Sequence, residues 1–363
     1  MWPLPARRTW PGRRGGEAGG GTGRHGVGEA PFYAIGVSDA PLPQLAAWSG
    51  EPDSLLVTLD TGERIHYLDW GGPAPLVRPP LPALPPLPPL LLIHGLAQTA
   101  WSWAPVARRL RGLTRVLAMD LRGHGLSDSP RSGYDLESLA YDALTVLVGN
   151  GWGRDAAGPP AAVAGHGLGA MVGATMAAIQ PDSIGALALV DGGWEELAEA
   201  TGQTPAEFER TLGDPPEVLR SMEDLLADRR DYDPRTWDAD QARAARSTVD
   251  QKYAGHVAPV TLLHALRGCV AAMFSYQPAE ALAGLRMPLL FAVADQGSAD
   301  DETARERRLA LEDVLRRRAG EDHSTTHVER YIAAGHNLMR YRPVELGAAI
   351  WRLLVESAAY QRS

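Results

Sequence analysis

Histidines that stand beside glycines are the residues in this sequence best suited to chemistry. Four of these places are His94-Gly95, His124-Gly125, Gly165-His166-Gly167 and Gly335-His336. Imidazole titrates near neutral pH, so histidine is the side chain most often used to take or donate a proton in catalysis. Short apolar runs typical of buried strands precede these segments, and glycine favours tight turns. The sequence therefore predicts turns that carry imidazole groups near the ends of strands.

Four segments resemble those of the α/β-hydrolase fold family, and together they cover the chain from about residue 53 to the C-terminus. They are residues 91–96, 119–128, 163–170 and 334–339. The resemblance implies that the backbone N–H groups of Leu96 and Leu168 form an oxyanion hole. It also implies that His336 is the general base. For the segment 119–128 it implies a structural role, with Asp and Arg side chains fixing the loop.

The third segment departs from the family at its most important position. The family pattern is G-x-S-x-G, and this sequence has Gly165-His166-Gly167-Leu168-Gly169, which places Gly167 where the nucleophilic serine stands. Glycine offers no oxygen, sulfur or carboxylate. It does adopt the strained backbone of that turn cheaply, so the replacement favours stability by about 1 kcal/mol while removing covalent acyl transfer. His166 is not expected to act as a nucleophile, because the family often has His there beside an intact serine.

The acid that would orient His336 is left open by the sequence. The strand candidate 288–293 runs into a segment that contains Asp295 and Asp300, and neither residue matches the family's usual G-x-x-D spacing. Asp295 is the first choice, Asp300 the second, and Asp191 after the preceding strand the third. Each could equally be a turn or helix-capping residue.

Three tryptophans are expected near the pocket. Trp101, Trp103 and Trp194 lie near loops that should face it, and an aromatic wall would suit a hydrophobic substrate. Tryptophans also serve core packing, which is the competing explanation.

The elements that must position these residues alternate between strands and helices. Short, continuously apolar strands separated by helices indicate a mostly parallel, twisted sheet covered on both faces, which is the α/β-hydrolase fold. An antiparallel hairpin is expected at 55–68. The expected strands are 90–93, 116–119, 161–164, 186–190, 289–293 and 328–332, and the expected helices are 103–111, 136–149, 168–179, 303–318 and 344–356.

The chain divides into three predicted parts. Residues 1–50 are rich in Gly, Arg and Pro and are predicted to be disordered. Residues 51–193 and 286–363 form the predicted core. Residues 194–285 interrupt the alternation with apolar residues at helical spacing, which predicts a helical cap over the carboxyl ends of the strands.

The charge composition bears on whether the protein binds nucleic acid. The net charge is −9, although residues 1–30 are basic, so nucleic acid is not an expected partner of the folded part.

The chain has one cysteine, Cys269, so it cannot form an internal disulfide. Cys269 is predicted to be a small packing residue on a helix. No apolar run is long enough to cross a membrane, and a cytoplasmic location is predicted. Zinc-type clusters, a P-loop and a dinucleotide fingerprint were not found, so no cofactor is predicted.

Two functions fit these observations. In the first, the oxyanion donors bind a carbonyl compound while His336 activates water, which hydrolyses an ester-like small molecule without an acyl-enzyme. In the second, the protein is an inactive member of the family that binds a small apolar ligand or a protein partner. Retention of His336 in its loop favours the first function. The sequence does not indicate an oligomeric state.

Overall fold

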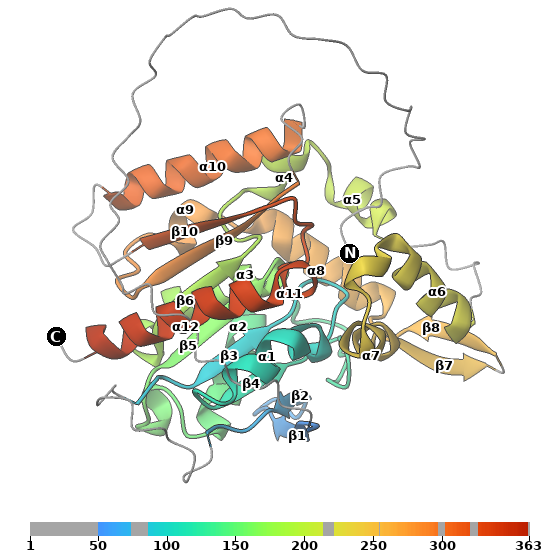
Figure 1. Cartoon of the computed structure of the whole chain (residues 1–363), viewed down its shortest axis with the longest axis horizontal. Coiled ribbons are helices and arrows are strands. Elements are labelled where there is room, and N and C mark those ends of the chain that lie inside the picture. Colours follow the sequence, from blue (N-terminus) through green and yellow to red (C-terminus); the bar gives the residue numbers. More distant parts are fainter. Residues whose placement is uncertain are drawn as a thin grey trace, which may run out of the picture.

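An eight-stranded sheet lies at the centre of the protein (Figure 1). The computed structural model describes residues 50–73, 86–212, 221–253, 255–296, 302–319 and 326–361. The strand order is β1-β2-β4-β3-β5-β6-β9-β10, in which β1 and β2 form an antiparallel hairpin, β2 pairs antiparallel to β4, and the other neighbours pair in parallel. The strands are β1 (Asp53–Thr58), β2 (Arg64–Asp69), β3 (Leu90–Ile93), β4 (Val116–Met119), β5 (Ala161–His166), β6 (Ile184–Val190), β9 (Leu289–Asp295) and β10 (Thr326–Ile332).

This sheet confirms the predicted fold class. Every strand expected from the apolar runs is present, and β3 and β4 have the predicted bounds. β5, β6, β9 and β10 each extend two residues beyond the prediction at one end. The central strands β3 to β6 are buried along their whole length, which accounts for their unbroken apolar sequence.

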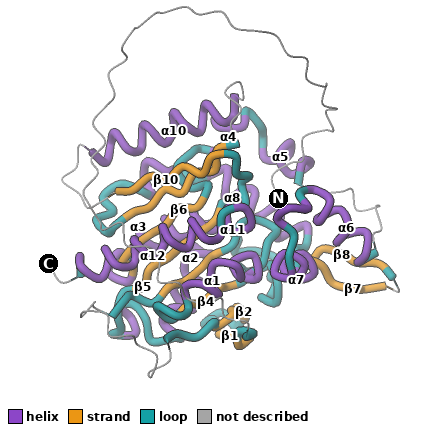
Figure 2. Tube along the Cα trace, in the orientation of Figure 1, coloured by secondary structure: helices purple, strands orange, loops and turns teal. Residues whose placement is uncertain are grey.

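Helices cover both faces of the sheet (Figure 2). On one face lie α1 (Ala104–Leu110) and α12 (Pro343–Tyr360), packed on inward side chains such as Leu92 and Ala164. On the other face lie α2 (Leu136–Gly149), α3 (Leu168–Ile179) and α10 (Glu302–Ala319). Short 3-10 turns lie at Ala100–Trp103, Arg154–Ala156, Pro181–Ser183 and Pro234–Thr236.

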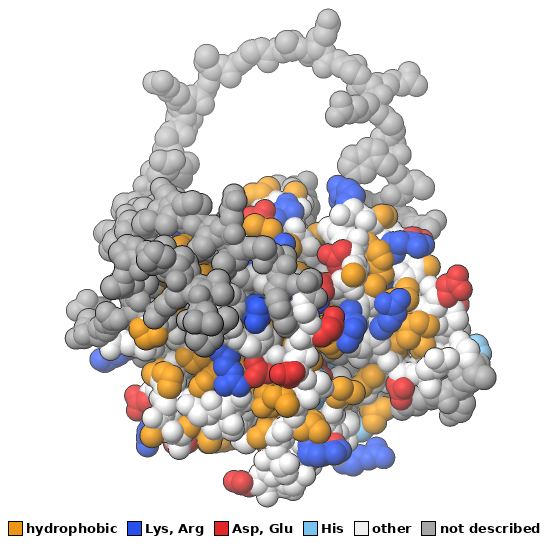
Figure 3. Space-filling view, turned by 60° about the horizontal axis from the view of Figure 1, so that its bottom comes forward, with side chains coloured by type: hydrophobic (Ala, Val, Ile, Leu, Met, Phe, Trp, Pro, Cys, Tyr) orange, Lys and Arg blue, Asp and Glu red, His pale blue; other side chains and the backbone are white. Residues whose placement is uncertain are grey.

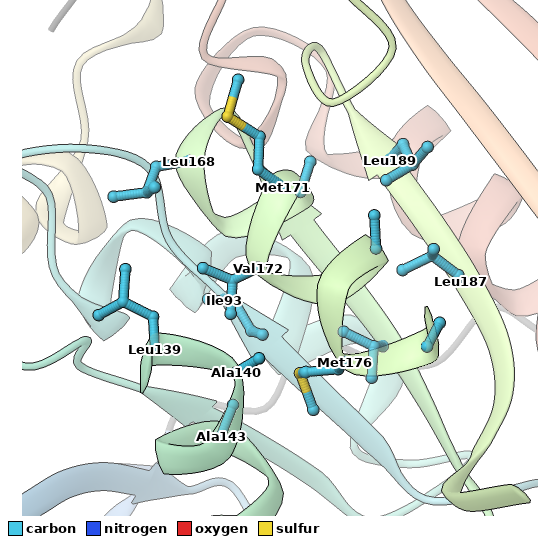
Figure 4. Close-up of a cluster of buried hydrophobic side chains, with 14 of the residues drawn as sticks. Ile93, Leu139, Ala140, Ala143, Leu168, Met171, Val172, Met176, Leu187 and Leu189 are labelled. Atoms are coloured by element: carbon cyan, nitrogen blue, oxygen red, sulfur yellow. The ribbon is translucent and has the colours of Figure 1, made fainter. Parts of the chain in front are cut away.

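The helix α3 is the best buried of these because it carries small and apolar residues on all sides. In Figure 4 its side chains meet β3, β6 and α2 in one cluster. The residues labelled there are Ile93, Leu139, Ala140, Ala143, Leu168, Met171, Val172, Met176, Leu187 and Leu189. This packing fixes the amino end of α3, which is where the candidate site lies.

The segment 194–285, predicted as a helical cap, contains both helices and a hairpin. We call this segment the cap. Its helices are α4 (Leu197–Thr201), α5 (Pro205–Thr211), α6 (Met222–Tyr232), α7 (Ala239–Ser247), α8 (Leu263–Ser275) and α9 (Pro278–Ala281). The strands β7 (Val249–Tyr253) and β8 (His256–Pro259) pair antiparallel and were not predicted. Cys269 lies fully buried in α8, where burial raises the pKa of its thiol to about 12.

Most of the predicted disordered segment, residues 1–49, lies outside the described residues. On the face drawn in Figure 3, basic and acidic side chains are interspersed. Within the described ranges, no helix is long and apolar enough to cross a membrane.

Candidate active site

The turn after β5 places Gly167 in a conformation that few other residues adopt. β5 ends at His166, α3 begins at Leu168, and Gly167 between them has φ 53° and ψ −114°. Glycine reaches positive φ at little cost, whereas a residue with a side chain is strained there. Gly169 then lets α3 pass close to β3, since a Cβ at that position would overlap the carbonyl oxygen of Ile93. A sharp strand-to-helix turn therefore lies where the sequence predicted one.

The imidazole of His336 lies directly beside this turn. His336 occupies the loop between β10 and α11 (Leu338–Tyr341). A Cβ added to Gly167 would lie 3.6 Å from His336 Nε2 and 3.8 Å from its Cε1. Both distances are ordinary van der Waals contacts. The two loops therefore open on the same side of the molecule, and a serine side chain would fit between them.

The His166 side chain is hydrogen-bonded to the backbone of the loop that carries His336. Its Nε2–H donates to the backbone carbonyl of His336 at 3.0 Å, and the two rings lie 4.4 Å apart between centroids. His166 is buried, and burial together with the nearby His336 ring holds its pKa well below the usual value. A neutral ring whose Nε2–H is already engaged has a positioning role, which agrees with the expectation that His166 is not a nucleophile.

Asp191 is the carboxylate that holds the His336 ring. Its Oδ2 accepts a hydrogen bond from His336 Nδ1–H at 2.6 Å, and Asp191 itself is only 1% exposed. Because Nδ1 is the donor, the lone pair of Nε2 faces Gly167. Asp191 follows β6 and has a positive φ of 46°, so its backbone is strained as well.

This contact corrects the order of preference among the acids. Asp295, the first choice from sequence, ends β9 and stands opposite Ile332 in the register with β10. Asp300, the second choice, lies outside the described residues. The hydrogen bond to His336 makes Asp191, the third choice, the proposed orienting acid.

A buried arginine, which the sequence did not single out, ties Asp191 to a second carboxylate. Arg307 of α10 donates from Nη2 to Asp191 Oδ1 at 3.1 Å and from Nε to Glu195 Oε1 at 3.0 Å. Burial alone would raise the pKa of Asp191, but Arg307 and the hydrogen bond from His336 outweigh it and hold the pKa well below its usual range. Burial would likewise lower the pKa of Arg307, and the two carboxylates hold it above its usual value. Asp191 is therefore ionised at neutral pH.

Two backbone N–H groups of the turn that carries Leu96 donate hydrogen bonds to side chains, which hold the turn in place. Gly95 N–H donates to Gln98 Oε1 at 3.1 Å, and Ala97 N–H donates to His124 Nε2 at 3.1 Å. Burial, followed by the field of a neighbouring His94, lowers the pKa of His124 to about 3, so the ring stays neutral and accepts this bond. Asp120 accepts from Ala100 N–H at 2.7 Å. The segment 119–128 thus has the structural contacts that the family resemblance implied.

These groups line an open pocket. It contains about 510 Å³ of empty space, part of it continuous with solvent. Gly167, His336, Leu96 and Leu168 are among its lining residues. Apolar side chains from the cap and α3 form much of the remaining wall, namely Met171, Leu197, Phe208, Leu212 and Met273. Leu168 begins a helix, and the first N–H groups of a helix lack intrahelical partners. The pocket therefore combines a backbone donor, an imidazole and an apolar wall.

The three tryptophans predicted for this wall lie elsewhere. Trp103 is fully buried under the sheet face that carries α1 and α12. Trp101 packs edge-on against Trp70 and beneath the guanidinium of Arg243, and Trp194 packs against Phe291. All three tryptophans therefore pack within the protein. Phe208 is a phenyl side chain on the pocket wall.

The cap is attached to the histidine loop through Arg340. This residue of α11 donates from Nε to Thr236 Oγ1 at 2.7 Å and from Nη2 to the carbonyl of Asp233 at 2.9 Å. Its guanidinium also lies 5.9 Å from the ring of Trp237. Residues 233–237 of the cap are thus tied to a helix that begins two positions after His336.

We expect Arg340→Ala to loosen the cap. Hydrogen bonds from a charged donor contribute about 1.5–3 kcal/mol each, so the variant should show faster amide hydrogen exchange over residues 229–237. Exchange in β5 and β6 should stay unchanged. Arg154→Ala is the matched control, because the Arg154 side chain is 66% exposed in a surface ion pair. Equal exchange over 229–237 in wild type and Arg340→Ala would show that Arg340 does not hold the cap.

In the described part of the chain, no group of three or more His, Cys, Asp or Glu side chains is arranged to hold a metal ion.

The amino-acid sequence matches the model of a known protein family. Residues 90–349 match the family model described as "Alpha/beta hydrolase family", which is well over half of the 363 residues. The chain belongs to the alpha/beta hydrolase family. The matched range contains the turn at Gly167, Asp191 and His336.

Curated relatives of this alpha/beta hydrolase-family protein share only part of their length with it. A 2-(acetamidomethylene)succinate hydrolase of Mesorhizobium japonicum is 34% identical over 102 residues, which are 28% of this chain and 34% of that protein. Epoxide hydrolase 4 of Mus musculus is 29% identical over 134 residues, which are 36% of this chain and 32% of that protein. The matching stretch thus spans about a third of each relative.

Solved structures show the same fold over most of the chain. The crystal structure of E-2-(acetamidomethylene)succinate hydrolase superposes with a TM-score of 0.64 at 22% identity, covering 83% of this chain and 99% of that one. A thioesterase domain from the curacin biosynthetic pathway gives a TM-score of 0.57 at 18% identity, covering 83% and 100%. At these identities the likeness establishes the fold.

Proposed function

We propose that this protein hydrolyses an ester-like or otherwise activated carbonyl compound, with His336 acting as general base on water in place of a serine nucleophile. The observation that carries the proposal is the pairing of His336 with Asp191 beside Gly167. Nδ1 is held by a buried, ionised carboxylate, so Nε2 is left to accept a proton in the space that the missing side chain does not fill.

The steps follow from the positions of these groups. A carbonyl oxygen bound by the N–H groups of Leu96 and Leu168 would place its carbon above Gly167. Water between that carbon and His336 Nε2 loses a proton to the imidazole and forms the new C–O bond. The negative charge that develops on the carbonyl oxygen is stabilised by the two N–H groups. Collapse of this intermediate breaks the bond to the leaving group, which receives the proton from His336.

The apolar wall suggests the substrate class. Methionine, leucine and phenylalanine side chains line the pocket, so the group next to the carbonyl is expected to be hydrophobic. Relatives whose names describe them as hydrolases act on small molecules, and we infer a small-molecule substrate here.

The competing proposal is an inactive protein that binds a small apolar ligand. Gly167 favours it, since glycine relieves the strain of the turn and removes the nucleophile. The His336–Asp191–Arg307 network favours hydrolysis, because a buried carboxylate such as Asp191 is costly and stabilises the protein less than an apolar residue would.

Replacing His336 by alanine separates the two proposals. General base catalysis contributes about 10²–10⁴-fold, so His336→Ala should lose that factor on the substrates that wild type turns over. Wild type and variant are assayed in parallel on p-nitrophenyl acetate, a lactone and a thioester. His327→Ala is the control, because His327 bonds Glu356 outside the pocket. Equal rates for wild type and His336→Ala would reject the water mechanism and favour the inactive binder.

A further inference from the structure

Gly167 leaves a space of defined shape beside the His336 ring. The atoms nearest to a Cβ built at this position are His336 Nε2 at 3.6 Å, His336 Cε1 at 3.8 Å and Gly95 Cα at 3.9 Å. Each is an ordinary contact, so no described side chain has moved in to fill the position of the serine. The space is bounded by a ring edge and by backbone, and it opens into the pocket that contains Leu96 and Leu168.

Without a serine at position 167, the acceptor of the acyl group must bind at a different stage of the reaction. With serine, the acceptor of the acyl group arrives after the first product has left. Here no covalent intermediate can form at position 167, so the acceptor must lie between the carbonyl carbon and His336 Nε2 while the acyl donor is still intact. The acceptor is therefore a second, non-covalently bound substrate.

We propose that this space is a binding site for small nucleophiles with an O–H or N–H group, and that the protein transfers the acyl group to them as well as to water. The inference rests on the proposed function of the same site. Hydroxylamine and methanol are of the right class, since each has two heavy atoms and gives up one proton, from N–H or O–H, to His336 as it attacks. The new bond forms between the nucleophile and the carbonyl carbon, the bond to the leaving group breaks, and the accepted proton passes to the leaving group.

The walls set a limit on the size of the acceptor. His336 Nε2, His336 Cε1 and Gly95 Cα lie 3.6, 3.8 and 3.9 Å from the Cβ position, so the ring edge and the backbone of Gly95 both border the space. We therefore expect branched nucleophiles to fit less well than unbranched ones, whatever their reactivity in solution. A size limit distinguishes a site from a simple encounter with dissolved nucleophile.

Hydroxylamine tests this inference with the full chain. The protein is mixed with p-nitrophenyl acetate and increasing hydroxylamine, and both p-nitrophenol and acetohydroxamate are measured. We expect the rate of p-nitrophenol release to rise about tenfold and to saturate, because the bound nucleophile takes part in the step that releases the leaving group. N-tert-butylhydroxylamine should give no rise. Rates with His336→Ala are subtracted as the background.

Gly167→Ala supplies a matched variant that fills the space. Its methyl group fits by the distances above, and it should abolish the saturable response while a thermal melt shows that the protein is folded. A response that is linear in hydroxylamine, or equal for the branched analogue, overturns the inference and leaves His336-dependent hydrolysis standing. If wild type and His336→Ala are equal with and without hydroxylamine, the proposed function fails and the inference fails with it.

Discussion

Gly167→Ser is expected to create a hydrolase that works through a covalent acyl intermediate. The serine Cβ would lie 3.6 Å from His336 Nε2, and its hydroxyl, one bond further, comes within hydrogen-bonding reach of that nitrogen. The ring is hydrogen-bonded to Asp191, and Leu96 and Leu168, the proposed oxyanion donors, line the same pocket. Removing a nucleophile from a complete triad costs several powers of ten, so restoring it should raise kcat on p-nitrophenyl acetate by on the order of 10²-fold or more.

A burst of p-nitrophenol and a stable adduct with a fluorophosphonate inhibitor are the measurements that identify this intermediate. Gly167→Ala and the double variant Gly167→Ser/His336→Ala are the controls. The first adds the same Cβ without a hydroxyl, and the second adds the hydroxyl without the base. If folded Gly167→Ser forms no adduct and shows no burst, then either the turn or His336 has been assigned the wrong role.

The same substitution should cost stability. A side chain at φ 53° is strained by about 1–3 kcal/mol relative to glycine. Gly167→Ser and Gly167→Ala are therefore expected to melt at lower temperature than wild type, by similar amounts. For Gly167→Ser, activity is therefore expected to rise while stability falls.

The parts of this site that could be predicted are those that depend on a short, continuous sequence motif. The turn at Gly167 is encoded by glycines at fixed spacing between an apolar strand and a helix of small residues. His336 stands between glycine and a helix in the same local way. The strands were predictable because burial on both faces requires unbroken apolar runs, which allowed β3 and β4 to be placed without error.

The acid could not be chosen from spacing because two strands end beside the same histidine. β6 and β9 are parallel neighbours in the sheet, so Asp191 and Asp295 both lie at the same edge. The choice depends on the loop conformation, in particular on the positive φ of Asp191 that the sequence does not signal. Arg307 was missed for a related reason, because it is one of many arginines on α10 and only tertiary packing buries it.

Arg307→Met is expected to destabilise the protein strongly at neutral pH. Asp191 and Glu195 are almost fully buried, and Arg307 is the cation paired with both, its own side chain being 16% exposed. Removing one partner of a buried ion pair leaves uncompensated charge and costs about 3–5 kcal/mol. Urea unfolding at pH 7 should therefore show a lower midpoint. The variant should also lose His336-dependent activity, because Asp191 loses a contact that holds its carboxylate.

The pH dependence of this loss gives the sharper test. In wild type the pKa of Asp191 lies below its unfolded value of about 4, so the stability it contributes is present above pH 4 and is lost as the pH falls further. Without Arg307, burial is less opposed and the pKa rises, so protonation relieves the buried charge at low pH. The difference between wild type and Arg307→Met should therefore be largest at pH 7 and shrink as the pH falls through 4.

Arg316→Met is the control for a change of charge on the same helix. Arg316 is 73% exposed and pairs with Asp313 on the surface, where an ion pair contributes little. Its unfolding midpoint should stay close to that of wild type at every pH. A loss in Arg307→Met that stays constant between pH 7 and pH 4 would mean that Arg307 stabilises the protein by packing, and that the charge of Asp191 is held by the hydrogen bonds from His336 and Ala294 alone.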